Sequence, residues 1–417
     1  MNTLREMKES GIEWVGSIPK DWNVKKGKYI FNFVQKPIRD NDGVITCFRD
    51  GEVTLRSNRR EEGFTMSDKE IGYQGIDEGD LVVHGMDGFA GAIGISDSRG
   101  KASPVLNVLD TYENKKYYMY FLRSAAWSGL FLSLATGIRV RTCDTNWGKL
   151  RNITYLIPSK YEQKKIANFL NIKCAEIDSL SDDIQSEIDT LEAYKKSIVT
   201  EAVTKGIDKS APIKDSGLPW VGEMPSHWKL VRGKYCLKYL QKPVRQDDGV
   251  ITCFRDGEVT LRSKRREEGF TMSDKEIGYQ GIDEGDLVVH GMDGFAGAIG
   301  ISDSRGKASP VLNVLDTEEN KKYFMYYLRS MAYGDVFLAL ATGIRVRSCD
   351  LRWNKLAELS YPIPPKDEQD AIVAYIDDKL HRADEIIREK QEQLDVLAEY
   401  KKSVIYEYVT GKKEVPV

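Results

Sequence analysis

The sequence lacks the features that mark most membrane, secreted and metal-binding proteins. No apolar run approaches the roughly 18 residues of a membrane span, and the N-terminal stretch MNTLREMKESG has no signal-peptide apolar region. We therefore expect a cytoplasmic protein without membrane contact. The six cysteines form no C-x-x-C pair, which favours buried thiols in a reducing compartment over a metal site. With only four histidines, no zinc cluster is expected.

Motifs for catalysis are also missing. The chain has no Asn-Pro-Pro-aromatic or Asp-Pro-Pro-aromatic stretch of an amino-methyltransferase and no G-x-S-x-G nucleophile elbow. The segment ISDSRGKASP (95–104) has no glycine at the position that a phosphate-binding loop requires before its lysine. Glu61–Glu62 and Asp77–Asp80 are interpreted as solvated turns. We therefore expect no catalytic residue and no metal bound by this chain.

A long internal repeat is the main feature that is present. Residues 42–111 recur as residues 248–317, and over these 70 aligned positions only Asn58 and Lys264 differ. The offset of 206 continues on both sides at lower identity. A period this long indicates a tandem domain duplication, because solenoid repeats run about 20–50 residues.

The charge is distributed unevenly along the chain. The net charge of −3 looks unfavourable for nucleic-acid binding until the chain is divided. Lys plus Arg against Asp plus Glu count 22 to 20 in residues 1–158 and 7 to 10 in 159–208. The counts are 23 to 21 in residues 209–364 and 9 to 13 in 365–417. The globular parts are slightly basic, and a local patch matters more than the total, so DNA binding is not excluded.

Each copy is predicted to be mixed α and β. Short β-type runs between Gly and Asp turns (VITCF, VTLRS, DLVVHGM, GAIGIS, VLNVL) fill about residues 28–110, and a helical pattern covers 113–134. The predicted fold class is α+β, with two near-identical domains joined by two long helices. The predicted parts are 1–158 (first domain with its lead-in), 159–206 (first long helix), 207–364 (hinge and second domain) and 365–417 (second long helix).

The two long helices carry apolar residues at heptad spacing. From about Tyr161 to Thr204 there is no proline or glycine, and a helix this long with one apolar stripe needs a partner. The other copy is the obvious partner, although Lys390 interrupts the register in the second helix. The predicted packing residues are Leu170, Ile177, Ile184, Leu191, Ile198, Ile376, Leu380, Ile387, Leu394, Leu397 and Val404.

Basic residues in loops are the strongest ligand-type signal. Arginine can hold phosphate or pair bidentately with guanine in the major groove. The alternative is an ordinary charged surface neutralised by Glu61 and Glu62. The glycine-rich stretch GMDGFAGAIG (85–94) is interpreted as a hairpin with close backbone contacts, with a loop that approaches DNA as the alternative. The candidate DNA-binding residues are Arg56, Asn58, Arg59, Arg60, His84, Lys101, Arg139 and Arg141, with repeat mates Arg262, Lys264, Arg265, Arg266, His290, Lys307, Arg345 and Arg347.

Segments at the domain–helix junctions resemble a known family. KLRNITYLIPSKYEQKKIANFLN (149–171) and KLAELSYPIPPKDEQDAIVAYID (355–377) are similar to the segment that closes each target-recognition domain in specificity subunits of type I restriction–modification enzymes. The lead-ins WVGSIPKDW and WVGEMPSHW, and the helix ends YKKSIVTEAVTKG and YKKSVIYEYVTGK, resemble the same family. The resemblance covers essentially the whole chain.

The resemblance implies a non-catalytic subunit that selects DNA. In that family the two long helices form an antiparallel coiled coil, and each domain reads half of a bipartite site. Two methyltransferase subunits dock on the assembly, and a translocating restriction subunit can join. S-adenosylmethionine, ATP and Mg are then expected on the partner subunits, with no cofactor on this chain.

Near-identical recognition domains predict a symmetric target. If the helices place the domains about a pseudo-two-fold axis, both strands are read alike, and the site is a near-palindrome interrupted by a spacer. The single difference, Asn58 against Lys264, adds a phosphate contact to one half or is neutral drift. The rival interpretation is a duplicated coiled-coil scaffold that binds protein instead of DNA.

Overall fold

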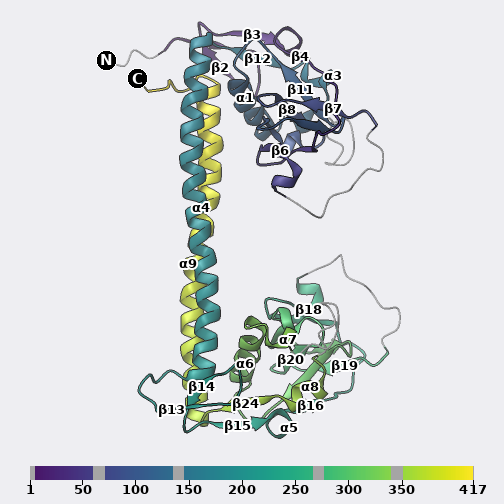
Figure 1. Ribbon diagram of the computed structural model, residues 1–417, viewed down its shortest axis with the longest axis vertical. Coiled ribbons are helices and arrows are strands. Elements are labelled where there is room, and N and C mark those ends of the chain that lie inside the picture. The colour runs from purple at the N-terminus through teal and green to yellow at the C-terminus, as the bar shows by residue number, and fades with distance from the viewer. Residues whose placement is uncertain (1–4, 60–70, 135–144, 266–276, 340–350, 417) are drawn as a thin grey trace. The chain divides into compact units, whose positions relative to one another are not determined.

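The computed structural model describes residues 5–59, 71–134, 145–265, 277–339 and 351–416. The chain forms two compact units, residues 1–184 with 392–417 and residues 185–391 (Figure 1). Each unit therefore combines one globular domain with parts of both long helices. Arg60, Arg139, Arg141, Arg266, Arg345 and Arg347 lie outside the described residues.

The globular part of the first unit is built on a four-stranded antiparallel sheet of order β4-β11-β8-β9. Three-residue hairpin strands β5 and β6 pair beside it, as do β7 with β10, β3 with β12 and β1 with β2. The strands are β1 (Met7–Glu9), β2 (Ser17–Pro19), β3 (Asn23–Lys26), β4 (Asn32–Phe33), β5 (Ile45–Cys47), β6 (Val53–Leu55), β7 (Gln74–Ile76), β8 (Leu81–His84), β9 (Ile93–Ile95), β10 (Gly100–Ala102), β11 (Leu106–Asp110) and β12 (Thr154–Ile157).

Strand β8 shows why the sheet has two buried faces. Successive side chains of a strand point to opposite faces. Leu81 and Val83 join the core cluster that includes helix α1 (Lys115–Trp127), while Val82 joins a smaller cluster under the β5–β6 hairpin. The continuous apolar run LVV therefore holds the hairpin to the sheet on one side and the helix on the other.

The helical segment after β11 is shorter than the sequence pattern predicts. Helix α1 begins at the N-cap Asn114, whose side chain accepts a hydrogen bond from the Tyr117 N–H. It ends before Gly129, which has a left-handed φ of 82°, and α2 (Leu130–Ser133) follows. The single helix expected over 113–134 is thus broken by a residue in a conformation that α-helices exclude. Helix α3 (Trp147–Leu150) and the 3-10 turns η1 (Gly27–Tyr29), η2 (Arg56–Asn58) and η3 (Gly88–Ala90) complete the domain.

The second unit repeats this arrangement element by element, with the sheet order β16-β23-β20-β21. Its strands are β13 (Ile213–Asp215), β14 (Glu223–Pro225), β15 (Lys229–Arg232), β16 (Lys238–Leu240), β17 (Ile251–Cys253), β18 (Val259–Leu261), β19 (Gln280–Ile282), β20 (Leu287–His290), β21 (Ile299–Ile301), β22 (Gly306–Ala308), β23 (Leu312–Asp316) and β24 (Ser360–Ile363). Its helices are α5 (Gly233–Cys236), η5 (Arg262–Lys264), η6 (Gly294–Ala296), α6 (Lys321–Tyr333), α7 (Val336–Ala339) and α8 (Trp353–Glu358).

The long helices are α4 (Lys160–Lys205), close to the predicted 159–206, and α9 (Lys366–Val409), which begins as predicted but ends before the predicted limit at residue 417. In the first unit the Phe169 and Tyr408 rings lie 4.4 Å apart, and Lys401 pairs with Asp178 at 2.5 Å. From Phe169 to Asp178 the residue numbers of α4 rise, while those of their α9 partners fall from Tyr408 to Lys401. The two helix segments are therefore antiparallel.

The second unit pairs its helix segments in the same sense. Lys195 contacts Asp384 at 2.6 Å, and these residues are the repeat mates of Lys401 and Asp178. Lys390, which interrupts the heptad pattern, ion-pairs with Glu187 of α4 instead of packing as an apolar residue. The predicted packing residues are buried or partly buried along both helices. The α+β fold class with two long paired helices is confirmed.

Candidate nucleic-acid interface

We call the duplicated stretches, residues 42–111 and 248–317, the reading segments. In the first of them, the turn after the β5–β6 hairpin carries Arg56, Asn58 and Arg59. Arg56, at the start of η2, donates from Nε to the Thr46 hydroxyl at 3.1 Å, and Arg262 donates to Thr252 at 3.0 Å. Both arginines are partly exposed. This hydrogen bond to a neutral hydroxyl fixes the direction of each guanidinium relative to the hairpin.

Arg59 is held more firmly than a free surface arginine. Its guanidinium lies 4.3 Å from the Phe48 ring centroid and pairs with Asp50 at 2.6 Å and Glu52 at 2.9 Å. The hydrogen bond that Arg59 donates to Asp50 raises the pKa of Arg59. Arg265 repeats this arrangement with Phe254, Asp256 and Glu258. Two carboxylates offset each charge, so we infer that these arginines chiefly brace the hairpin.

The one difference between the reading segments changes the local bonding. The Asn58 amide donates to the Thr54 hydroxyl at 2.8 Å. Lys264 instead contacts Asp303 at 3.2 Å and the Ser304 hydroxyl at 2.7 Å. The lysine charge is thus partly offset by the Asp303 carboxylate. Asp303 and its mate in the first unit, Asp97, each accept a hydrogen bond from the hydroxyl of the next serine.

His84 and His290 organise the turn after their strands. Nδ1 of His84 accepts hydrogen bonds from the backbone N–H groups of Met86 at 3.2 Å and Asp87 at 3.0 Å. His290 does the same with Met292 and Asp293. Burial lowers the pKa of both histidines, which favours the neutral ring. A neutral ring cannot supply a cation to phosphate, and the structure gives these residues a turn-stabilising contact.

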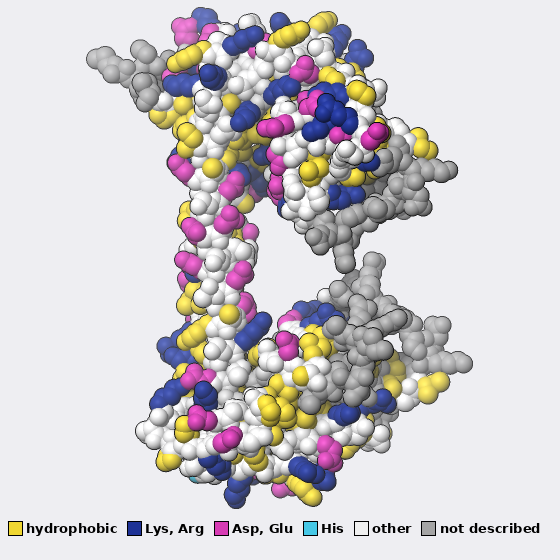
Figure 2. Space-filling view, viewed as in Figure 1, with side chains coloured by type: hydrophobic (Ala, Val, Ile, Leu, Met, Phe, Trp, Pro, Cys, Tyr) yellow, Lys and Arg dark blue, Asp and Glu magenta, His cyan; other side chains and the backbone are white. Residues whose placement is uncertain are grey.

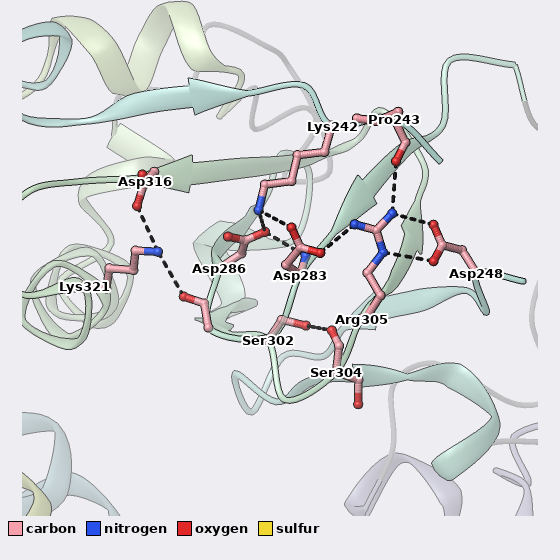
Figure 3. Close-up of polar contacts among 11 residues, drawn as sticks. Lys242, Pro243, Asp248, Asp283, Asp286, Ser302, Ser304, Arg305, Asp316 and Lys321 are labelled. Carbon is pink, nitrogen blue, oxygen red and sulfur yellow. Dashed lines mark hydrogen bonds and ion pairs between the residues drawn. The ribbon is translucent and has the colours of Figure 1, made fainter. Parts of the chain in front are cut away.

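Sequence reasoning missed an ionic network beside Lys101 and Lys307. Arg305 binds both oxygens of Asp248, at 3.0 and 2.8 Å, then Asp283 at 2.6 Å and the Pro243 carbonyl at 3.0 Å (Figure 3). Lys242 bridges Asp283 and Asp286 at 2.8 and 2.6 Å. Figure 3 shows these side chains converging from separate strands and loops.

The same network in the first unit corrects one expectation. Asp77 and Asp80, interpreted from the sequence as solvated turns, are paired with Lys36 at 2.8 and 2.6 Å, and Asp77 also binds Arg99 at 2.7 Å. Hydrogen bonds from Lys36 and Arg99 lower the pKa of Asp77 to about 2. Arg99 also forms an ion pair with Asp42. This contact holds the start of the reading segment beside β10, the strand that contains Lys101. The aspartates are therefore structural anchors.

The glycine-rich stretch is a hairpin with close backbone contacts, as favoured from the sequence. Strands β8 and β9 pair antiparallel, with η3 between them and Gly91 at a left-handed φ of 97°. A Cβ on Gly94 would stand 2.0 Å from the Gly51 carbonyl oxygen. A side chain at this position would therefore force the backbone at Gly51, just before β6, or β9 itself to shift.

The Glu-Gln pair at each domain–helix junction is a structural clamp. Gln163 is fully buried; its amide donates to Glu113 at 2.9 Å and to the Pro158 carbonyl at 3.0 Å, and its oxygen accepts from the Asn114 N–H at 3.0 Å. Glu162 accepts from the buried Trp22 indole at 2.8 Å. Gln369 and Glu368 repeat these bonds in the second unit.

Acidic residues outnumber basic ones in the two long helices, so their net charge is negative. Figure 2 shows acidic side chains outnumbering basic ones on the face of the helices that it presents, in line with their sequence composition.

None of the helices in the described part of the chain has the length and apolar character that a membrane span requires. The described Cys47, Cys174 and Cys253 are buried free thiols, as expected, and Cys236 is partly buried.

Comparison with known proteins gives matches over nearly the full length. No family model matches the chain. The "Putative type I restriction enzyme MjaX specificity subunit" of Methanocaldococcus jannaschii is 23% identical over 96% of both chains. A chain from the solved assembly of a type I R-M system aligns with a TM-score of 0.65 and 12% identity, covering 95% of this chain and 99% of that one.

A crystal structure of the HsdS subunit from Thermoanaerobacter tengcongensis aligns over 97% of this chain and 100% of that chain, with a TM-score of 0.48 and 13% identity. The sequence match spans both globular domains and both helices, and the first structural match shows the same fold. The resemblance inferred from the sequence is therefore confirmed: over nearly its full length this chain is similar to a specificity subunit of a type I restriction enzyme.

Proposed function

We propose that this chain is the non-catalytic DNA sequence-specificity subunit of a type I restriction–modification complex and that its target is bipartite and near-palindromic. The observation that carries the proposal is the duplicated reading segment, residues 42–111 and 248–317, with one difference in 70 positions. The copies also match in geometry. Arg99 binds Asp42 at 2.7 Å and Arg305 binds Asp248 at 2.8 Å, while Arg56 and Arg262 use the same hydroxyl partner.

Equal reading segments favour equal half-sites. Two surfaces with the same side chains in the same local geometry select the same bases, as the two halves of a dimeric repressor do. Within each unit the helix segments pair antiparallel, and we propose that the two copies read DNA in opposite directions. The proposed target therefore has inverted half-sites, separated by base pairs that neither domain reads.

The remaining parts of the proposal come from the family. Two methyltransferase subunits dock on the chain, one for each repeat, and restriction subunits can join them. Those partner subunits bind S-adenosylmethionine, ATP and Mg. This chain then contributes target choice and the spacing between the half-sites, and the double-stranded DNA is its own ligand.

A map of N6-methyladenine in DNA from cells that carry the complete system tests the proposal. The expected result is one methylated motif with inverted, near-identical halves around a fixed spacer, and its loss when this gene is deleted. Two unrelated half-sites would refute the symmetric target. Two results together would support the scaffold interpretation instead. The motif would persist after deletion of the gene, and the assembled complex would show no salt-sensitive binding of DNA.

A further inference from the structure

A methionine is exposed on the turn after β8, and its repeat mate is exposed on the turn after β20. Met86 and Met292 are each 53% exposed, although the residue before each of them, Gly85 or Gly291, is buried. A single exposed apolar side chain is common on protein surfaces, so exposure by itself indicates no role. This methionine differs from an ordinary surface residue in the way its backbone is held.

The backbone around Met86 is fixed by hydrogen bonds from three directions. The N–H groups of Met86 and Asp87 both donate to Nδ1 of His84, at 3.2 and 3.0 Å. The Gly85 N–H donates to the Val105 carbonyl at 2.8 Å. Water satisfies an exposed N–H about as well as a side chain does, so the histidine is not needed to satisfy the turn. Its effect is to fix the direction in which the methionine is presented.

The second copy keeps this turn although a different residue packs beneath it. The Thr145 N–H donates to the Gly85 carbonyl at 2.7 Å, and in the second unit the Leu351 N–H donates to the Gly291 carbonyl at 2.9 Å. Thr145 and Leu351 are repeat mates outside the reading segments, and both are buried. The same turn, with the same exposure of its methionine, therefore forms in two different packing environments.

Charged groups of the β5–β6 hairpin lie beside the turn. Arg49, between the two strands, pairs with Asp87 at 2.8 Å, and its side chain is 67% exposed. Arg255 pairs with Asp293 at 3.0 Å in the second unit. The candidate Arg56 follows the same hairpin, so the methionine and the basic residues belong to one surface. An apolar centre with a polar rim is the usual composition of a binding surface.

An apolar side chain on such a surface can recognise only one feature of the base edges. In the major groove the bases present hydrogen-bond donors and acceptors, and thymine alone adds an apolar group, its C5 methyl. Methionine has no N–H or O–H with which to read the polar groups. Its unbranched thioether chain adapts to the shape of an apolar partner.

We propose that Met86 and Met292 each contact the C5 methyl group of one thymine and so determine one base pair in each half-site. The inference rests on the proposed DNA-reading function and deepens it by naming a base reader. Because the two turns are equivalent, the thymine occupies the same position in both half-sites.

Uracil substitution in the target duplex tests the contact, because uracil lacks only the C5 methyl group of thymine. The duplex carries the methylated motif, and the chain assembled with its methyltransferase subunits is titrated against it. Loss of one buried methyl group should weaken binding about fourfold at one thymine position in each half-site. Met86→Ala should weaken binding of the unmodified duplex by a similar factor and abolish the uracil effect in one half-site. Met292→Ala should abolish it in the other.

Two further variants serve as controls. Met86→Leu keeps an apolar side chain and should retain the uracil effect. Tyr112 is 91% exposed but lies outside the reading segment, and its mate is Glu318, so Tyr112→Ala should leave binding and the uracil effect unchanged.

The outcomes separate this inference from the function on which it rests. Half-sites without thymine, no uracil effect, or an equal uracil effect in the parent and both alanine variants would overturn the methionine contact. Sequence-selective binding would persist in each of these cases, and the proposed function would stand. A parent complex without sequence-selective binding would overturn both.

Discussion

The Tyr117 hydroxyl donates a hydrogen bond to the Val409 carbonyl at 2.9 Å, although 292 positions separate the two residues. In the second unit, Tyr323 donates to the Val203 carbonyl at 3.2 Å. Each globular domain therefore closes over the end of the helix that belongs to the other repeat. Val404, Ile405 and Val409 are part of the first core, and Val199 and Val203 are part of the second.

This exchange of helix ends predicts that half of the chain will form a dimer. A fragment of residues 1–206 contains a domain that needs a helix end and a helix end that such a domain accepts. Antiparallel self-pairing of α4 would also rebuild an Asp178–Lys195 ion pair, because Lys195 is the mate of Lys401. Light scattering after gel filtration should give twice the fragment mass. The Val199→Asp, Val203→Asp double variant should abolish the dimer, and a folded monomeric fragment would contradict the exchange.

Removal of the buried glutamine clamp should destabilise the first unit. Gln163→Ala breaks three hydrogen bonds and leaves the Asn114 N–H and two acceptors unpaired. The expected loss is about 2–4 kcal/mol in the free energy of unfolding. Urea denaturation measures it. Gln185→Ala, which removes only an exposed contact with Asp189, is the control and should change stability little. Equal effects of the two substitutions would show that the clamp is not a stabilising element.

The ionic networks predict a loss of stability in acid. The folded-state pKa of Asp77 is about 2, below its ordinary value of 3.8, and that of Asp283 is also about 2 because Lys242 and Arg305 bind it. A depressed pKa contributes stability above pH 3.8, and this contribution is lost as the pH falls from about 4 to about 2. Urea midpoints at pH 6, 4 and 2.5 should fall more steeply for the parent than for Asp77→Asn, Asp283→Asn. Parallel curves would exclude these aspartates as the cause.

Shortening both helices should shorten the spacer of the DNA target. Residues 183–189 and 389–395 are repeat mates, and the Lys390–Glu187 contact shows that the two segments pair with each other. Deleting both removes one heptad from each helix, about 10 Å of length, with almost no rotation. The methylated motif should lose about three base pairs of spacer while its half-sites stay the same. Deletion of only one segment should disrupt the pairing, and an unchanged spacer after the double deletion would refute the role of the helices.

Lys264→Asn makes the two reading segments identical and tests their single difference. The ion pair of Lys264 with Asp303 is half exposed, and such pairs are worth about 0–1 kcal/mol, so a DNA phosphate can replace it. The variant should bind all sequences more weakly, with the salt slope reduced by about one, and should methylate the same motif. Asn58→Lys should have the opposite effect on affinity. Unchanged affinity in both variants would indicate neutral drift, and a changed motif would make Lys264 a base reader.

Local patterns in the sequence determined the duplication, the α+β class and the helix bounds. Heptad spacing without proline or glycine placed the first helix at 161–204, and α4 spans Lys160–Lys205. The α+β class and the helix bounds depend on residues a few positions apart, whereas the duplication is visible because two stretches 206 positions apart share their sequence. The stretch GMDGFAGAIG was likewise interpreted correctly as a hairpin, because glycine spacing directly limits which backbone contacts are possible.

Only the tertiary structure decided which distant groups meet. Asp42 and Arg99 are 57 positions apart, and nothing in either local sequence distinguishes a network aspartate from a solvated one. The pairing of Lys390 with Glu187 was missed for the same reason. The break at Gly129 is instead a local feature, a glycine with a left-handed φ inside a helical pattern. Trp14 and Trp220 share their sequence context, yet only the residue packed against each, Phe121 or Tyr327, determines whether the indole is satisfied. The periodicity that predicts helices and strands depends on neighbouring residues, whereas the partner of a polar group depends on how distant parts of the chain pack.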